Sequence, residues 1–345
     1  MDNKPKSSRV TLREVARIAD VSEVTASRAL RNPELVSERL RERVVAAARE
    51  LAYIPNQMAS ALASSRTGRV AFIVPSLTNG VFDDYLRAAY DVFTPAAFQV
   101  VILNSNYAPG FEEKAIETAL GQYPEAIVLA GIDQTDRARR LLSQAGIPVV
   151  QTMEIADDPI DINIGLSHFE AGHAAARLLF ELGHRKVGHM ASPLDSRARE
   201  RVRGYLRAVH EYGAEPIVVS EDEPSSVAVG VDLLGEILRI EPATSAIFCG
   251  NDNLALGALF ECQRRGVRVP EDMSLIGFND LEFAKSAFPA LSTVATPRYE
   301  MARRAAEIIL QITRGSGKRP RKRCIDLGFE VIERGSTRRV SVAAK

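Results

Sequence analysis

Polar and basic side chains gather in a short segment near the amino terminus. A predicted helix ending near Leu30 presents on its outward side Glu23, Val24, Thr25, Ser27 and Arg28, with Ser22 at its start. Arginine pairs bidentately with guanine, and glutamate accepts a hydrogen bond from the cytosine amino group. Hydroxyl groups and the amides of a helix amino terminus suit phosphate. The segment therefore predicts a helix that enters the major groove of DNA, although a small helical bundle without a DNA role stays an alternative.

Three predicted helices position these side chains. Thr11 and Glu14 form a capping box that starts the first helix, and Ser22 caps the second. Asn32-Pro33 stops the second helix, and Ser37 caps a third. Three short helices with a tight turn between the first two predict a helix-turn-helix unit.

Charge is distributed unevenly along the 345 residues, although the chain as a whole is neutral. Residues 1–66 hold 12 Lys and Arg against 8 Asp and Glu, a net charge of +4. The remaining 279 residues hold 32 basic and 36 acidic groups, a net charge of −4. A basic head on an acidic body fits a nucleic-acid-binding head, although the asymmetry is mild.

Apolar runs alternate with helical patterns beyond residue 69. This alternation predicts an α/β fold whose body has two lobes built on parallel sheets. The expected strands cover 70–74, 100–103, 126–130, 149–152, 187–190, 217–219, 246–249 and 274–278, with a last strand at 324–327.

Ligands of such sheets bind beyond the carboxyl ends of the strands, and two lobes place those ends at a common cleft. The residues there are rich in hydroxyls, amides and arginines, which suit a polyhydroxy ligand with a negative charge. Ordinary solvated loops are the alternative for each position. The candidate binding residues are Ser76, Thr78, Phe82, Arg197, Arg201, Asn251 and Asn279.

Several functional classes lack support in the sequence. The three cysteines lie far apart and predict reduced, packed side chains, and the five histidines lack metal-ligand spacing, so we expect no metal and no cofactor. The loop after the first strand has no G-x-G-x-x-G turn, which argues against a dehydrogenase, and we expect no enzymatic activity. No apolar run reaches 18 residues and no secretory signal is evident, so we expect a cytoplasmic protein without a membrane partner.

The head resembles that of the lactose-repressor (LacI/GalR) family of transcription regulators. The resemblance rests on four segments, 10–16, Val21-Ser22, 25–30 and Tyr53-Ile-Pro-Asn56. It implies an operator-binding domain at 1–55, in which Thr11 also contacts DNA, and a hinge helix and linker at 56–68. Asn56 would belong to the DNA-binding surface of that hinge, and Leu62 matches a leucine that wedges between base pairs in the minor groove. The alternative is that Leu62 packs the linker.

Motifs of the body extend the resemblance over nearly the whole chain. They are Phe169-Glu-Ala-Gly, Leu182-Gly-His-Arg-Lys-Val-Gly-His, Arg201-x-x-Gly-Tyr, Gly250-Asn-Asp-Asn-Leu-Ala-Leu-Gly and Ile276-Gly-Phe-Asn-Asp. They imply a periplasmic-binding-protein-like effector and dimerisation domain at 69–340, with Arg201 and Asn251 at effector positions. The first lobe would cover about 69–164 and 297–323, and the second about 165–296 and 324–340. Asn279 stands where the family commonly has an aspartate, which favours an acidic ligand over a neutral sugar.

A narrower resemblance concerns the ligand. Pro75–Phe82, Phe260–Arg264 and Asp326–Phe329 look like the corresponding segments of gluconate-utilisation repressors within that family. We therefore expect a repressor of genes for sugar-acid catabolism, controlled by gluconate or a phosphorylated relative. A different sugar, a phosphorylated sugar or a nucleobase remains an alternative effector, and a sugar-binding protein a less favoured function.

The remaining partners follow by analogy with the family. We expect double-stranded operator DNA and a homodimer, with a dimer interface that includes the predicted helix 82–93 and its residues Tyr85, Ala89 and Phe93. The tail after Arg334 has no leucine heptads, so a coiled-coil tetramer is not expected.

Overall fold

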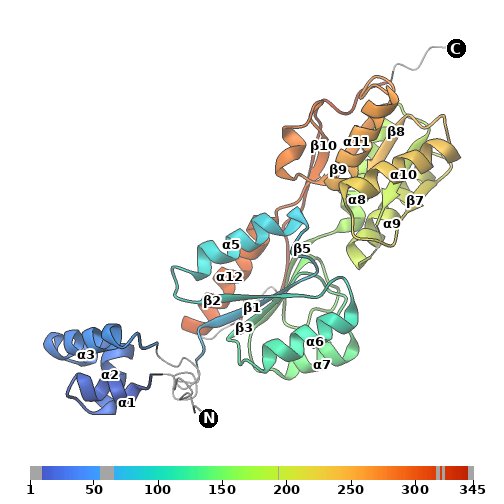
Figure 1. The fold of residues 1–345 in the computed structure, drawn as a ribbon. Coiled ribbons are helices and arrows are strands. Elements are labelled where there is room, and N and C mark those ends of the chain that lie inside the picture. Colours follow the sequence, from blue (N-terminus) through green and yellow to red (C-terminus); the bar gives the residue numbers. More distant parts are fainter. Residues whose placement is uncertain (1–9, 55–65, 193, 316–318, 321–322, 341–345) are drawn as a thin grey trace, which may run out of the picture. The chain divides into compact units, whose positions relative to one another are not determined.

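The computed structural model describes residues 10–54, 66–192, 194–315, 319–320 and 323–340. Its contacts divide the chain into two compact units, Met1–Thr67 and Gly68–Lys345. Figure 1 shows the elements of each unit in chain order. Each unit has a core of its own and is described separately.

The amino-terminal unit is a small helical head. Its elements are α1 (Leu12–Ile18), α2 (Glu23–Arg31), η1 (Pro33–Leu35) and α3 (Glu38–Glu50). The predicted capping box is present: Glu14 N donates to Thr11 Oγ1 at 3.4 Å, and Thr11 N donates to Glu14 Oε2 at 2.8 Å. Ser22 caps α2, where its Oγ accepts from Thr25 N at 3.1 Å.

Small side chains fill the core of the head. Val15 and Val44 are fully buried, and six alanines surround them on the inner sides of the three helices. Alanine allows helix axes to approach closely, so a core of this size is closed by three short helices. The buried set is Val15, Ala16, Ala19, Ala26, Ala29, Val44, Ala47 and Ala48.

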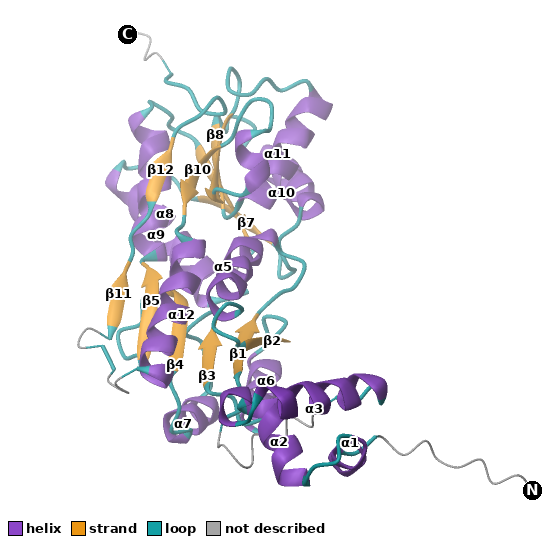
Figure 2. Cartoon of the chain, turned by 90° about the vertical axis from the view of Figure 1, so that its left-hand side faces the viewer, coloured by secondary structure: helices purple, strands orange, loops and turns teal. Residues whose placement is uncertain are grey.

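The carboxy-terminal unit contains two lobes, each built on a six-stranded sheet with helices on both faces (Figures 1 and 2). The sheet of the first lobe has the order β11-β5-β4-β3-β1-β2, and all its pairs are parallel. Helices α5 and α12 cover one face, whereas α6 and α7 cover the other. The bounds are β1 (Arg69–Val74), β2 (Gln99–Asn104), β3 (Ala126–Leu129), β4 (Val149–Glu154), β5 (Ile162–Leu166), β11 (Cys324–Asp326), η2 (Gly80–Phe82), α5 (Asp83–Phe93), α6 (Pro109–Leu120), α7 (Asp136–Gln144) and α12 (Arg298–Arg314).

The second lobe repeats this plan. Its sheet has the order β12-β10-β9-β8-β6-β7, and only the β10–β12 pair is antiparallel among the described strands. Helices α10 and α11 pack together on one face, and α8 and α9 pack together on the other. The bounds are β6 (Val187–Ala191), β7 (Ile217–Ser220), β8 (Ala246–Cys249), β9 (Ser274–Asn279), β10 (Ser292–Ala295), β12 (Glu330–Ile332), α8 (His168–Glu181), α9 (Ser196–Glu211), α10 (Val227–Ile240), α11 (Asp252–Arg265) and η3 (Glu282–Lys285).

These elements confirm the predicted α/β class with its three-helix head and two sheets. The chain passes between the lobes after β5, after β10 and after β11. Because β11 pairs with β5, Cys324–Asp326 belongs to the first sheet, whereas the sequence analysis assigned residues 324–340 to the second lobe. Strand β5 itself spans the expected boundary at residue 164.

The predicted dimer contact of three side chains is wrong. Tyr85, Ala89 and Phe93 are fully buried within the single chain. Their spacing places them on the inner side of α5, where they contact the first sheet instead of facing outward. Helical spacing alone does not tell which partner an apolar stripe meets.

Among the described residues, no helix is both long enough and apolar enough to cross a membrane.

Candidate functional site

The outer side of α2 carries the predicted DNA-binding side chains. Ser22, Glu23, Val24 and Arg28 are exposed, and Val24 is 66% exposed although it is apolar. Thr25 and Ser27 are half-buried, and the inner side of α2 is formed by Ala26 and Ala29. An exposed apolar side chain amid polar groups suits contact with a thymine methyl group.

Contacts with α3 hold this helix in place. The Arg43 guanidinium donates to the carbonyl of Ala19 at 2.6 Å and to that of Asp20 at 3.3 Å, so it fixes the turn between α1 and α2. Asp20 has a φ of 49°, which the turn requires. The predicted DNA-binding residues Asn56 and Leu62 lie outside the described residues, and their roles stay predictions.

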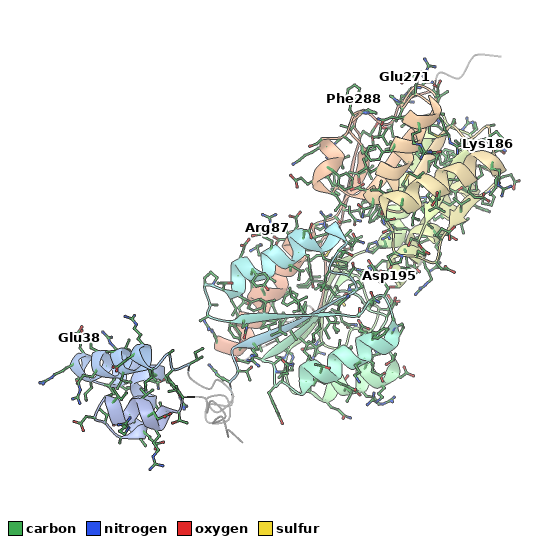
Figure 3. All side chains as sticks on the ribbon, viewed as in Figure 1. Glu38, Arg87, Lys186, Asp195, Glu271 and Phe288 are labelled. Carbon is green, nitrogen blue, oxygen red and sulfur yellow. The ribbon has the colours of Figure 1, made fainter. Side chains whose placement is uncertain are left out.

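A polar pocket lies between the two lobes of the carboxy-terminal unit, where the strands of both sheets end. Figure 3 labels Asp195, at the start of α9, beside the junction of the lobes. The pocket encloses about 600 Å³ of space outside the atoms, part of it open to solvent. Its described lining is Asn79, Val81, Phe82, Tyr107, Met153, Leu166, His168, Ser192, Leu194, Asp195, Arg197, Ala198, Arg201, Ser225, Asn251, Asn279, Thr296, Arg298 and Met301.

Arg201 presents a positive charge to this pocket. Its Nη1 donates to His168 Nδ1 at 2.9 Å, and its guanidinium lies 4.7 Å from the centre of the Phe278 ring. Its Nε is buried without a hydrogen-bond partner, and no salt bridge to Arg201 occurs among the described residues. Burial and the neighbouring charge of Arg197 lower the pKa of Arg201 to about 10, so it stays charged near neutral pH.

His168 is a neutral partner of this arginine. Burial and the charges of Arg201 and Arg197 hold the pKa of His168 well below its usual value. Since Nδ1 accepts from Arg201, the ring proton sits on Nε2, which donates to the carbonyl of Met153 at 3.2 Å. A neutral histidine does not compensate the charge of Arg201, and Asp195, whose charge also acts on Arg201, forms its ion pair with Arg197. The guanidinium of Arg201 is therefore available to an anion.

Arg197 differs from Arg201 because a carboxylate neutralises it. Its Nε donates to Asp195 Oδ2 at 2.9 Å, and Asp195 also caps α9 by accepting from Ala198 N at 2.9 Å. Burial opposes ionisation of Asp195, but the charges of Arg197 and Arg201 outweigh it and lower its pKa to about 2. This ion pair fixes the first turn of α9 and leaves Arg201 as the free charge on the same helix.

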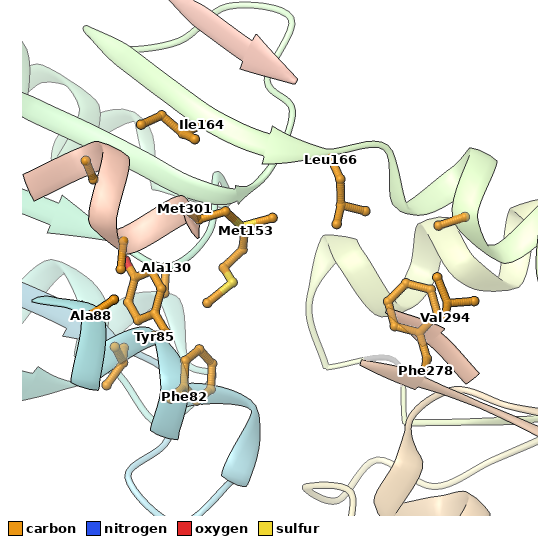
Figure 4. Close-up of a cluster of buried hydrophobic side chains, with 14 of the residues drawn as sticks. Phe82, Tyr85, Ala88, Ala130, Met153, Ile164, Leu166, Phe278, Val294 and Met301 are labelled. Carbon is orange, nitrogen blue, oxygen red and sulfur yellow. The ribbon is translucent and has the colours of Figure 1, made fainter. Parts of the chain in front are cut away.

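An apolar wall faces the charged groups. Figure 4 shows Phe82, Tyr85 and Met153 grouped in the first lobe, opposite Phe278 in the second. Phe82 is 2% exposed and packs edge-on against Tyr85, with ring centres 6.4 Å apart. The Tyr85 hydroxyl lies 2.7 Å from Thr152 Oγ1, which removes its polar end from the wall. Such a wall suits the carbon skeleton of a small ligand.

The structure therefore brings together five of the seven predicted pocket residues: Phe82, Arg197, Arg201, Asn251 and Asn279. Asn251 also caps α11, because its Oδ1 accepts from Leu254 N at 3.0 Å. Ser76 and Thr78 are not among the described lining residues. Ser76 Oγ accepts from the amides of Thr78 and Asn79 at 3.2 and 3.1 Å, so it shapes the loop that carries Asn79. Ligand contact by Ser76 and Thr78 stays a prediction.

The sequence analysis missed several lining residues, of which Arg298 matters most. It is 5% exposed, and its Nη1 donates to the carbonyl of Asn279 and, at 2.9 Å, to Thr296 Oγ1. Its Nη2 lies 3.6 Å from Asp84 at the start of α5. The position of Arg298 shortly after a strand could have revealed it, but that strand, β10, has only four residues and was not predicted. His168 and Tyr107 were missed as well, although His168 directly precedes the Phe169 motif.

Asn279 sits in a strained turn that Arg298 stabilises. Asn279 and Asp280 have φ values of 106° and 53°, and such values cost about 1–3 kcal/mol each in non-glycine residues. Arg298 holds the carbonyl between them, and Arg334 lies 2.8 Å from Asp280. The turn directs the Asn279 amide toward the pocket in place of a carboxylate, so no acidic side chain repels an anion there.

Family models match a segment of each unit. Residues 11–56 match the model of the lacI family of bacterial regulatory proteins, and residues 176–337 match the periplasmic binding protein-like domain. The chain is 41% identical over 338 residues to the HTH-type transcriptional regulator GntR of Pseudomonas aeruginosa, covering 97% of this chain and 98% of that protein.

Solved structures resemble the whole chain. A Lacl family transcriptional regulator from Silicibacter pomeroyi has a TM-score of 0.89 at 36% identity, covering 95% of this chain and 99% of that one. The lac repressor dimer bound to operator and the anti-inducer ONPF has a TM-score of 0.80 at 26% identity, covering 96% of this chain and 100% of that one. The chain therefore belongs to the LacI family of bacterial regulatory proteins and is a DNA-binding transcription regulator.

Proposed function

We propose that this regulator is a homodimeric repressor of sugar-acid catabolism genes and that its effector is a small polyhydroxy anion, with gluconate as the first candidate. The observation that carries the effector class is the charge of Arg201, which is buried beside a neutral histidine and has no carboxylate partner among the described residues. A carboxylate or phosphate group would satisfy its unpaired Nε.

The rest of the pocket lining supports the same ligand class. Three arginines line the pocket against one aspartate, so its described lining has a positive net charge. Amide and hydroxyl groups of Asn79, Asn251, Asn279 and Tyr107 provide donors and acceptors for several hydroxyl groups. The resemblance of Pro75–Phe82 to gluconate-utilisation repressors points to the same ligand.

The proposed mechanism couples this pocket to DNA. Two heads bind two half-sites of a near-palindromic operator in the cytoplasm, with the outer side of α2 in the major groove. The effector changes the angle between the lobes and so the spacing of the two segments around residues 56–68, where Leu62 is expected to wedge between base pairs.

Calorimetry of the full chain tests the effector class. Gluconate, 6-phosphogluconate, ribose and guanine are titrated separately into the protein. Gluconate or 6-phosphogluconate is expected to bind, and the two neutral compounds, ribose and guanine, are expected not to bind. Binding of ribose or guanine alone would contradict it and would favour a regulator of sugar or nucleobase metabolism.

Selection from a random duplex library tests the DNA part independently. The full chain is incubated with duplexes of random sequence, and the retained duplexes are amplified and sequenced. A dimeric reader enriches a near-palindrome with half-sites about one helical turn apart. Retention without sequence enrichment would contradict specific operator recognition.

A further inference from the structure

Two carboxylates of the first lobe contact the amino end of α9 in the second lobe. Asp133 Oδ2 accepts from Ser196 N at 2.7 Å, and Glu154 Oε2 accepts from Ser196 Oγ. Asp133 Oδ2 also lies 3.5 Å from Arg199 Nη2. Asp133 follows β3 and Glu154 ends β4, so the two carboxylates reach α9 from two different strands.

The contacted helix is the one that carries the pocket arginines. Ser196 is the first residue of α9, directly before Arg197 and five residues before Arg201. The amino terminus of a helix has a partial positive charge, which an ionised carboxylate such as that of the exposed Asp133 stabilises by about 0.3–1 kcal/mol. Glu154 is 5% exposed, so burial disfavours its charged form, and it holds the helix through its hydrogen bond with Ser196.

We propose that Asp133 and Glu154 form a latch between the lobes that closes the cleft and positions α9, and with it Arg201, for the effector. The latch consists of Asp133, Glu154 and Ser196. Because it holds the helix through Ser196, the two acids act as positioning residues and need not touch the ligand. The latch depends on the proposed function in one respect, because the proposed function assigns the pocket as the effector site.

The surroundings of Glu154 make the latch sensitive to pH. Burial raises the pKa of Glu154 to about 7; the Ser196 hydrogen bond and the charge of Arg197 oppose this rise, and Asp133 and Asp195 add to it. If opening the cleft exposes the Glu154 carboxyl to water, as the latch requires, its pKa is expected to return toward the ordinary value of 4.5. Closure therefore binds a proton near neutral pH.

The sign of the pH dependence follows from this linkage. The pKa of Glu154 is higher in the closed form than in the open form, so protonation of Glu154 favours closure. This contribution to closure is largest at low pH and is lost as pH rises through about 7. The equilibrium constant for closure is expected to be about tenfold smaller at pH 8 than at pH 6. Glu154→Gln imitates the protonated form and is expected to remove the dependence.

A distance measurement without ligand tests the latch directly. Spin labels are placed at Lys114→Cys on α6 and Glu271→Cys in the second lobe, both exposed, in a chain with Cys324→Ser. Labelled chains are mixed with an excess of unlabelled chain, and pulsed electron paramagnetic resonance gives the distance distribution at pH 6 and pH 8. Wild type is expected to gain a longer distance at pH 8, and Glu154→Gln to keep the shorter one at both. Ser196→Ala removes the hydroxyl that Glu154 contacts and keeps the backbone amide that Asp133 contacts, so it is expected to show more of the longer distance than wild type at pH 6.

Asp252 provides the matched control. Burial raises its pKa to about 7 as well, but its hydrogen-bond partners, Leu281 N and Thr293 Oγ1 at 2.7 Å each, both belong to the second lobe. Asp252→Asn is therefore expected to keep the wild-type response of the distance. A distance that does not change with pH in wild type, or that responds unchanged in Glu154→Gln, would overturn the proposal.

Gluconate titrations extend the test to the pocket. Wild type is expected to bind gluconate about tenfold more weakly at pH 8 than at pH 6, and Glu154→Gln to bind it equally at both. A tenfold fall that persists in Glu154→Gln would contradict the latch. If gluconate does not bind at all, the proposed effector is refuted, while the distance measurement still decides the latch.

Discussion

At the scale of single residues, the pocket depends on one unpaired guanidinium. Arg197 and Arg201 lie on adjacent turns of α9, yet Asp195 neutralises the first, whereas the second contacts the neutral His168 and the ring of Phe278. The difference arises from chain geometry, because the carboxylate that caps α9 lies two residues before Arg197 and so reaches it. The same helix thus supplies one ion-paired arginine and one arginine that is available to a ligand.

Arg201→Ala is expected to weaken effector binding by about 10-fold to 150-fold, the loss of a hydrogen bond to a charged group, about 1.5–3 kcal/mol. Operator affinity of the effector-free protein is expected to stay unchanged. Calorimetry and fluorescence anisotropy with labelled operator measure the two effects. Arg201→Lys is the matched control, which keeps the charge but loses the guanidinium fork and is expected to show an intermediate loss. Wild-type effector affinity in Arg201→Ala would refute the pocket assignment.

The recognition helix offers a prediction of the same kind. Arg28→Ala is expected to reduce operator affinity by about 1–3 kcal/mol and to relax the preference at one base pair, because an arginine pairs bidentately with guanine. Competition between operators with single substitutions measures that preference. Arg49→Ala, which removes an exposed arginine from the last turn of α3, is the control. Equal losses on cognate and random DNA would assign Arg28 to a phosphate contact instead.

At the scale of elements, the contact between α8 and α9 sets the position of Arg201. A Cβ atom on Gly204 would lie 2.2 Å from the carbonyl oxygen of Phe169, and one on Gly172 would lie 2.7 Å from that of Arg201. The two helices thus approach through glycines, one turn from the binding arginine. The neighbouring Tyr205 ties α9 to its sheet by donating to the carbonyl of Val187 at 2.8 Å.

Gly204→Ala is expected to push α9 away from α8. The cost is about 1–3 kcal/mol of folding free energy, as for other overpacked sites, together with weaker effector binding. Thermal unfolding and effector titration measure the two effects. Gly110→Ala in α6 is the matched control, because a Cβ atom there would meet nothing within 4 Å and its φ is not in the left-handed region. A Gly204→Ala protein with wild-type stability would contradict the close packing of α8 against α9 at this position.

The sequence predicted the elements well where local signals were strong. The capping box of Thr11 and Glu14 and the cap at Ser22 set the head, and apolar runs revealed eight strands of the two sheets. The strands β5, β10 and β12 escaped prediction, although β3, β7 and β8 are no longer than β10. Polar residues or a glycine interrupt the apolar run in each of the three, which read INIGL, STVA and EVI. Arg298 was missed for that reason, since its role depends on where β10 ends.

Tertiary packing decided what the sequence left open. The stripe of Tyr85, Ala89 and Phe93 fits a partner chain or a sheet equally well, and the structure assigns it to the sheet. Asp195, two residues before Arg197, is a local signal for the ion pair, whereas the contact of Arg201 with His168 joins two helices and has no local signal. The pairing of β11 with β5 joins residues 161 positions apart and has no local signal.

At the scale of the whole molecule, one chain is proposed to couple operator binding by the head to effector binding by the body. The head and the body are separate compact units, and a family of transcription regulators combines them. If the effector changes operator affinity by a given factor, the operator must change effector affinity by the same factor. Coupling in such systems is commonly about 1–3 kcal/mol, or about 5-fold to 150-fold.

Operator affinity at fixed salt, measured with and without saturating effector, tests this coupling most directly. A change of at least about fivefold is expected in wild type, with the same factor in the reverse titration, and a smaller change is expected in Arg201→Ala at the effector concentration that just saturates wild type. Equal operator affinity in the presence and absence of a ligand that occupies the pocket would contradict this coupling.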